Sequence, residues 1–116
     1  MTAAPLRVLI AEDDQLAGTI CARALTNAGY EVSVATDGRS ALDMLQEGSF
    51  DLVVTDMVMP TMDGLELVQQ MRDDPRLTRL PVVFLTSCTE HEMRVRGYRA
   101  GCDAYLVKPA RPVDLV

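Results

Sequence analysis

Residues 52–56, Leu-Val-Val-Thr-Asp, decide the fold of this chain. A short apolar run rich in β-branched residues is typical of a strand that is buried on both faces of a sheet. The run ends at Asp56, and an idle carboxylate beside a buried strand would be energetically costly. We therefore interpret residues 52–55 as a central strand and Asp56 as the first candidate functional residue.

Four more short apolar runs have the same strand character, and stretches with helical spacing separate them. The five predicted strands are residues 6–11, 32–35, 52–55, 82–85 and 104–107. A chain that alternates strands with helices forms parallel strands joined by helical crossovers. Residues 31–34 alternate polar with apolar side chains, as an edge strand does, whereas the first, third and fourth runs belong in the centre. The predicted fold is a doubly wound, flavodoxin-like α/β sheet of order 2-1-3-4-5.

Acidic and hydroxyl side chains mark where the helices begin. An N-cap acceptor is predicted before each of four helices, at Asp14, Asp37, Asp63 and Thr89. In the first of these helices, apolar residues recur with the spacing of one buried face: Leu16, Ala17, Ile20, Cys21, Ala24, Leu25 and Ala28. Residues 110–116 begin like a fifth helix and stop after about two turns. We expect that incomplete helix to leave an apolar strip of the sheet uncovered.

Length and composition exclude several classes of protein. The 116 residues are 48% hydrophobic, so one domain spanning residues 1–116 can bury its own core. Eleven basic residues against seventeen acidic ones leave a net charge of −6, which argues against a nucleic-acid-binding domain. No apolar run is long enough to span a membrane, and no secretory signal is present. Cys21, Cys88 and Cys102 form no C-x-x-C pair, so a reducing cytoplasm is the expected location.

Side chains that can carry chemistry follow the predicted strands where each strand ends. Glu12 and Asp13 follow the first strand, and Asp56 follows the third. Thr86 closes the fourth strand, and Lys108, the only lysine of the chain, follows the fifth. Because the carboxyl ends of parallel strands meet at one edge of a sheet, we expect these side chains to share a site. Carboxylates gathered in this way repel one another unless a cation lies among them, and oxygen ligands suit Mg²⁺.

Asp56 is interpreted as a nucleophile, because aspartate forms an aspartyl phosphate in phosphoryl-transfer chemistry. Such a step needs charge neutralisation more than it needs a proton-accepting base. Lys108 and the hydroxyl of Thr86 would each donate to a phosphoryl oxygen. Taken singly, each residue has a structural alternative, as a helix cap, a solvated charge or a strand-end hydroxyl.

Taken together, these residues resemble the response-regulator receiver domain, the CheY-like family of two-component signalling. The resemblance spans nearly the whole sequence. It rests on Glu12-Asp13-Asp14, Asp56-Met57-Val58-Met59-Pro60, Met62-Asp63-Gly64, Thr86, Ala100-Gly101-Cys102-Asp103-Ala104-Tyr105 and Lys108-Pro109. Each motif is weak alone, and the ordered combination is highly specific.

The resemblance implies that Asp56 receives a phosphoryl group from a phosphohistidine on a histidine kinase or a histidine phosphotransfer protein. Asp13, Asp56 and the backbone carbonyl of Val58 would ligate Mg²⁺, and Glu12 would act through water. Lys108 would pair with Asp56 or with its phosphate. The chain would be a switch that catalyses its own phosphorylation and dephosphorylation, rather than a conventional turnover enzyme, and it would need no cofactor other than Mg²⁺.

By the same resemblance, Thr86 and Tyr105 form a switch pair. Phosphorylation adds about two negative charges and three acceptors, which would draw the Thr86 hydroxyl toward the phosphate and let the Tyr105 ring turn inward. The face made by the fourth helix, the fifth strand and the fifth helix would then change for a downstream protein, a fused domain or a second copy. No direct contact with nucleic acid or membrane is expected. The family also has a cis peptide at the position of Lys108-Pro109.

The sequence departs from the family pattern at three positions. Val58 stands two residues after Asp56, where many relatives carry a polar side chain. We hypothesise that apolar Val58 positions attacking water poorly and makes the phosphorylated form comparatively long-lived. Ala104 replaces an acid that DNA-binding relatives often use in a dimer, and Ala110 stands where the family usually has Phe. Both departures weaken a transcription-factor assignment.

The fourth helix carries three arginines with two interpretations. Glu90 lies four residues before Arg94, and Glu92 lies four before Arg96, so both pairs are predicted to form ion pairs on the helix surface. The alternative is that Arg94, Arg96 and Arg99 form a docking patch.

Three other functions compete with the phosphorylated switch. A flavodoxin-like cofactor binder would need a small, hydroxyl-rich phosphate loop where Glu12-Asp13-Asp14 stands. An aspartate-nucleophile phosphatase of the haloacid dehalogenase type would need a second aspartate at Val58. A docking module that is never phosphorylated would have no use for Asp56 and Lys108 together.

Overall fold

The computed structural model describes residues 5–108, and five parallel strands form its centre. The strands are β1 (Arg7–Ala11), β2 (Glu31–Ala35), β3 (Leu52–Thr55), β4 (Val82–Thr86) and β5 (Ala104–Val107). The helices between them are α1 (Gln15–Asn27), α2 (Gly38–Glu47), α3 (Gly64–Asp73) and α4 (His91–Ala100). The order is β2-β1-β3-β4-β5, with every neighbouring pair parallel. The predicted α/β fold and its strand order are confirmed.

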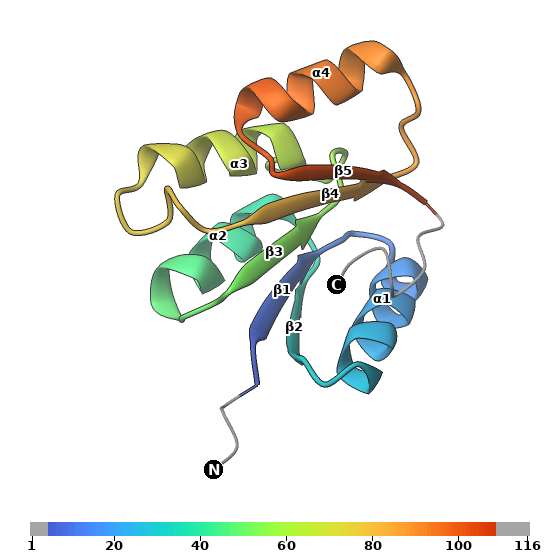
Figure 1. Cartoon of the computed structure of the whole chain (residues 1–116), viewed down its shortest axis with the longest axis vertical. Coiled ribbons are helices and arrows are strands. Elements are labelled where there is room, and N and C mark those ends of the chain that lie inside the picture. Colours follow the sequence, from blue (N-terminus) through green and yellow to red (C-terminus); the bar gives the residue numbers. More distant parts are fainter. Residues whose placement is uncertain (1–4, 109–116) are drawn as a thin grey trace.

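The helices cover the two faces of the sheet unequally. Helix α1 packs on one face, and α2, α3 and α4 pack on the other (Figure 1). The larger core lies between the sheet and these three helices, where Leu9, Val53 and Phe84 are fully buried. A smaller core lies under α1 and includes Ile10 and Val54. The central strands are therefore buried on both faces, as their continuous apolar sequence predicts.

Three of the four predicted helix caps are present. Asp14, Asp37 and Asp63 each accept a hydrogen bond from a backbone N–H three residues later, at 3.1, 2.7 and 2.9 Å. The prediction for Thr89 was wrong, because α4 begins at His91 with Glu90 as its N-cap residue and has no side-chain cap. The three aspartate caps are held by local contacts, so they leave these acids with a structural role.

The predicted buried face of α1 was wrong at two positions. Leu16 is 69% exposed and Ile20 is 61% exposed. Cys21 and Leu25 of the predicted face are buried, together with Gly18, so the buried stripe is narrower than predicted. A Cβ at Gly18 would make only ordinary contacts, 3.6 Å from Val34 and 3.7 Å from Glu12, so this glycine does not decide how closely α1 approaches the sheet. The helix contacts the sheet along the buried stripe, and Leu16 and Ile20 lie beside that stripe and stay exposed.

The predicted fifth helix at residues 110–116 and the peptide bond between Lys108 and Pro109 lie outside the described residues. Within residues 5–108, no helix is both long enough and apolar enough to cross a membrane.

Candidate functional site

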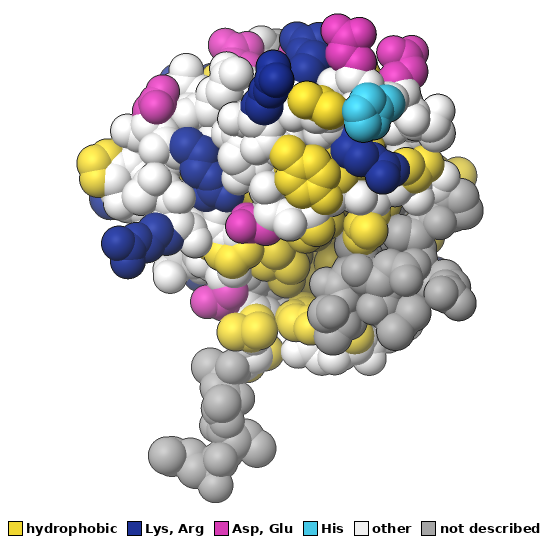
Figure 2. Space-filling model, turned by 45° about the horizontal axis from the view of Figure 1, so that its top comes forward, with side chains coloured by type: hydrophobic (Ala, Val, Ile, Leu, Met, Phe, Trp, Pro, Cys, Tyr) yellow, Lys and Arg dark blue, Asp and Glu magenta, His cyan; other side chains and the backbone are white. Residues whose placement is uncertain are grey.

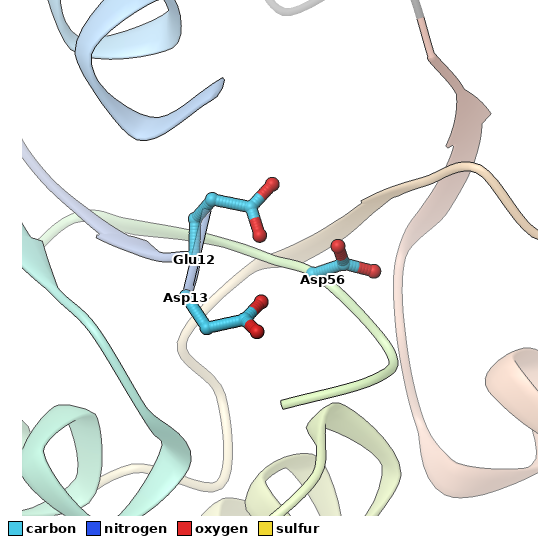
Figure 3. A group of neighbouring side chains, drawn as sticks. All are labelled: Glu12, Asp13 and Asp56. Carbon is cyan, nitrogen blue, oxygen red and sulfur yellow. The ribbon is translucent and has the colours of Figure 1, made fainter. Parts of the chain in front are cut away.

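The ends of β1 and β3 bring three carboxylates together. The strands are paired with Ala11 opposite Thr55, and the N–H of Asp56 donates to the carbonyl of Ala11 at 3.0 Å. The acids that follow these strand ends therefore lie at one edge of the sheet. Glu12, Asp13 and Asp56 each place a carboxylate oxygen within 4.8 Å of the others (Figure 3). Three acids that the sequence separates thus form one cluster.

Lys108 joins this cluster from the end of β5. Its backbone N–H donates to the carbonyl of Thr86 at 2.9 Å, which fixes the start of the side chain beside β4. The ammonium then donates to Asp56 Oδ2 at 3.0 Å and to Glu12 Oε1. The Glu12 side chain is only 6% exposed, so this contact takes place largely out of water. The chain's only lysine is therefore an internal counter-ion of the carboxylates.

The loop after β3 holds the Asp56 carboxylate in place. The backbone N–H of Met57 donates to Asp56 Oδ1 at 2.7 Å. Gly64, the first residue of α3, donates its N–H to the carbonyl of Met57 at 2.8 Å. A Cβ at Gly64 would lie 2.0 Å from the carbonyl oxygen of Asp56, so only glycine permits this close approach. Sequence reasoning included Gly64 only as part of a motif and missed its steric role.

Electrostatics keep Asp56 anionic. Burial raises the pKa of its carboxyl, but hydrogen bonds from Thr86 and Lys108 outweigh burial, and the pKa lies below its ordinary value. Burial lowers the pKa of Lys108, but its hydrogen bonds to Glu12 and Asp56 outweigh that effect, so its pKa is raised. At neutral pH Asp56 is therefore an anion and Lys108 a cation.

Glu12 is the member of the cluster whose charged form is disfavoured. Burial raises the pKa of its carboxyl, the hydrogen bond from Lys108 opposes this, and the charge of Asp56 raises it further, so the pKa lies above its ordinary value. Three carboxylates against one ammonium leave two negative charges in one small space. A further cation at this position would relieve that repulsion.

Thr86 and Tyr105 are connected through Cys88. The N–H of Cys88 donates to Thr86 Oγ1 at 3.3 Å, and the hydroxyl of Tyr105 donates to the carbonyl of Cys88 at 2.9 Å. The Tyr105 ring is 6% exposed and lies 6.1 Å from the ring of Phe84. The Tyr105 hydroxyl is therefore bound to the backbone, and the ring is buried rather than placed at the solvent-exposed edge of the sheet. The ring already occupies the inward position that the resemblance associates with switching.

Glycine also explains why this ring fits. A Cβ at Gly97 of α4 would lie 3.2 Å from carbons of both Phe84 and Tyr105. The missing side chain lets α4 approach the sheet closely enough to cover the ring. Nothing in the local spacing of the helix indicates this contact, because it depends on strands that are distant in sequence.

Val58 is placed differently from the other candidates. Its side chain is 63% exposed on the loop after Asp56, and its N–H lies 3.5 Å from Asp56 Oδ1. The residues at this edge can therefore supply carboxylate oxygens, an ammonium and backbone groups to one centre. Such a donor set fits a hard divalent cation together with an anionic group that carries several oxygen atoms.

Comparison with known proteins agrees with this geometry. Residues 8–116 match the family model for the response regulator receiver domain. The chain is 42% identical over 108 residues to a protein named response regulator MprA from Mycolicibacterium vanbaalenii, covering 90% of this chain and 45% of that protein. The chain spans about half the length, or less, of the first curated relatives that it matches.

Two solved structures show the same architecture over nearly their whole length. The chemotaxis response regulator CheY4 of Vibrio cholerae has a TM-score of 0.89 and 35% identity, with 96% of this chain and 92% of that chain covered. The receiver domain of sensor histidine kinase PA1611 from Pseudomonas aeruginosa has a TM-score of 0.89 and 27% identity, with 97% and 92% covered. That structure is described with a magnesium ion coordinated in its active site cleft. The chain therefore belongs to the response regulator receiver domain family, whose members are signalling switches of two-component systems.

Proposed function

We propose that Asp56 accepts a phosphoryl group from a phosphohistidine on a histidine kinase or a histidine phosphotransfer protein. The observation that supports this most strongly is the placement of Asp56, which is both a member of the carboxylate cluster and a partner of Lys108. An acid used only as a helix cap, such as Asp63, has no such second contact among the described residues. One side chain thus meets the two requirements of a phosphoryl acceptor, nucleophilic oxygen and local positive charge.

In the proposed step, a carboxylate oxygen of Asp56 attacks phosphorus and the P–N bond to the donor imidazole breaks. The electron pair of that bond leaves with the imidazole nitrogen. Lys108 and the Thr86 hydroxyl donate to phosphoryl oxygens, which stabilises the charge that they carry in the transition state. No side-chain base is required, because Asp56 is already an anion.

We propose that Asp13, Asp56 and the backbone carbonyl of Val58 hold Mg²⁺, with Glu12 acting through water. The carboxylate cluster fits this role because it offers hard oxygen ligands and an excess of negative charge. The bound ion would supply charge neutralisation between the carboxylate and the phosphoryl oxygens. Lys108 remains the positive group that the chain itself contributes.

The proposed switch uses the path from Thr86 to Tyr105. When the Thr86 hydroxyl turns toward a phosphate on Asp56, its hydrogen bond from Cys88 changes, and Cys88 also holds the Tyr105 hydroxyl. Phosphorylation would therefore shift the population of Tyr105 ring positions toward the inward one. The readout would be the surface around α4 and β5, recognised by a downstream protein, a fused domain or a second copy. We propose that residues 1–116 form one receiver domain, and that it acts in the cytoplasm.

Incubation with acetyl phosphate tests the proposal. With Mg²⁺ we expect the intact protein to gain the mass of one phosphoryl group, in a linkage that is stable to acid and labile to base. Asp56→Asn should lose the adduct completely, whereas Asp43→Asn, an exposed acid on α2, should retain it. Loss of the adduct in both variants, or in neither, would refute the assignment.

The same assay separates the competing functions. A docking module that is never phosphorylated gives no adduct at any Mg²⁺ concentration, and a phosphatase releases phosphate over many turnovers. A flavin cofactor would show a visible absorption spectrum. We expect none of these results.

The lifetime of the adduct tests the role of Val58. Val58→Asn places a polar side chain beside Asp56 and should shorten the lifetime several-fold, because it can orient an attacking water. An unchanged lifetime would refute this role of Val58 without affecting the assignment of Asp56.

A further inference from the structure

The arginines of α4 do not form the predicted ion pairs. Within residues 5–108, neither Arg94 nor Arg96 has an acidic partner within ion-pair distance. This holds although Glu90 lies four residues before Arg94 and Glu92 lies four residues before Arg96. Arg96 instead lies 3.8 Å from the sulfur of Met93. Helix surface pairing is weak and easily replaced by other contacts. The two guanidinium groups can therefore still bind a carboxylate of another molecule.

Arg94 makes a contact that no other arginine of α4 shares. Its guanidinium carbon lies 5.3 Å from the centroid of the Tyr105 ring, which is a cation–π distance. The Tyr105 hydroxyl is bound to Cys88, and Cys88 is bound to Thr86. A continuous series of contacts therefore runs from the neighbour of Asp56 to an exposed arginine on the surface of α4.

We propose that Arg94 and Arg96 bind an acidic segment of a partner protein, and that Arg94 transmits this binding to the Tyr105 ring. The proposal rests on the function proposed above for its biological use, because the transmitted signal reaches Thr86 and Asp56. A carboxylate that engages Arg94 competes with the ring face for the guanidinium. Docking then changes how firmly the Tyr105 ring is held.

Charge complementarity selects an acidic segment as the occupant. The chain as a whole carries a net charge of −6, yet the helix from His91 to Ala100 contains three arginines and one glutamate. In Figure 2, which brings the α4 side of the molecule forward, basic and hydrophobic side chains lie beside one another on this face, and acidic side chains lie along its top edge. Tyr98 of α4 is 49% exposed and offers apolar contact area on the same helix. An acidic peptide with apolar side chains matches such a surface, whereas the overall charge disfavours DNA.

The coupling must act in both directions. If docking changes the orientation of Tyr105, then a change at Asp56 that moves Tyr105 must change the affinity for the acidic segment by the same factor. Arg94 is therefore a positioning residue for the switch as well as a contact residue for the partner. Arg96, which does not touch the ring, should contribute to binding alone.

The experiment uses a glutamate hexapeptide as the probe and the protein labelled with fluorotyrosine. Fluorine NMR follows the Tyr105 resonance, which Tyr105→Phe identifies, while titration gives the affinity. We expect the peptide to bind at low salt and to shift this resonance. Arg94→Gln should weaken binding at least about fivefold and abolish the shift. Arg39→Gln, which removes an equal charge from α2, should change neither result.

Two further variants separate binding from transmission. Arg96→Gln should weaken binding but leave the bound-state shift of Tyr105 intact. Arg94→Lys keeps the charge without the planar guanidinium, so it should restore part of the affinity and little of the shift. Treating the protein with acetyl phosphate and Mg²⁺ should change the peptide affinity of the wild type and leave that of Arg94→Gln nearly constant.

Several results would overturn the inference. One is equal binding of the peptide to the wild type and to Arg94→Gln, and another is a Tyr105 resonance that does not move at saturation. A third is tighter binding of a lysine hexapeptide, or of a short DNA duplex, than of the glutamate peptide. Failure of phosphorylation alone would instead show as absence of the adduct while the peptide still binds and shifts Tyr105. The two proposals therefore fail in different measurements.

Discussion

Two clusters of charge lie at opposite ends of the sheet, and they differ in how completely their groups are paired. At the carboxyl ends of the strands, three carboxylates face a single ammonium. At the amino ends of β4 and β5, the guanidinium of Arg72 is surrounded by acceptors. Its Nη2 donates to the carbonyl of Gly101 at 2.7 Å, and its Nη1 donates to that of Leu80 at 2.8 Å.

The Arg72 cluster has no charge left over. Arg72 also forms an ion pair with Asp103 at 3.3 Å, and Asp103 in turn accepts from the N–H of Val82 at 2.8 Å. Each of these donors has an acceptor, so this cluster ties the end of α3 to the starts of two strands. A saturated polar cluster stabilises a fold, whereas an excess of one charge marks a place for a ligand.

Removing the saturated cluster should give the largest loss of stability. Arg72→Met leaves several carbonyls and Asp103 without their donor, so we expect the free energy of unfolding to fall by about 3 kcal/mol. Arg76→Met removes an exposed arginine whose one ion-pair partner among residues 5–108 is Asp74, and it should cost less than about 0.5 kcal/mol. Urea unfolding of both variants checks this, and equal losses would show that the Arg72 cluster is not special.

Magnesium should stabilise the opposite cluster. At a Mg²⁺ concentration of about one hundred times the dissociation constant, we expect the wild type to gain about 2.7 kcal/mol of unfolding free energy. Asp13→Asn removes one carboxylate and should lose most of this gain, whereas Asp43→Asn should keep it. Thermal unfolding with and without Mg²⁺ measures the difference. A gain that Asp13→Asn retains in full would place the ion elsewhere.

A smaller loss of unfolding free energy is expected when the acid removed is Asp37, whose carboxylate already accepts a hydrogen bond from the backbone. Hydrogen bonding from the N–H of Ser40 lowers the pKa of Asp37, the cap of α2. Asp37→Ala should cost about 1 kcal/mol at neutral pH. Because the pKa is lowered on folding, this contribution is complete above the unfolded pKa and should disappear as the pH falls below roughly 4. Unfolding of both proteins from pH 3 to 7, approximately, tests this sign; a difference that grows in acid would contradict it.

The sequence predicted the framework well because the framework depends on local patterns. All five strands lie where the apolar runs are, and the edge position of β2 follows from its alternation. The gathering of Glu12, Asp13, Asp56 and Lys108 follows from strand order, since parallel strands end at one edge. These residues could be placed together without any knowledge of side-chain contacts.

The failed predictions depend on contacts between distant segments. Leu16 and Ile20 have helical spacing, but α1 contacts the sheet along Gly18, Cys21 and Leu25 and leaves both side chains exposed. Arg94 has a local acidic neighbour, yet it lies on the Tyr105 ring instead. The close packing at Gly64 and Gly97 likewise involves atoms from other elements. Periodicity carries no information on such contacts.

The most direct test of the account is to locate the phosphoryl group. Protein treated with acetyl phosphate and Mg²⁺ is reduced with borohydride, which converts an aspartyl phosphate to homoserine, and the residue is then identified by peptide mass spectrometry. The account predicts homoserine at Asp56 alone, and only in samples that contained Mg²⁺. Homoserine at Asp13 or at another acid, or equal conversion of Asp56 with the metal chelated, would contradict it.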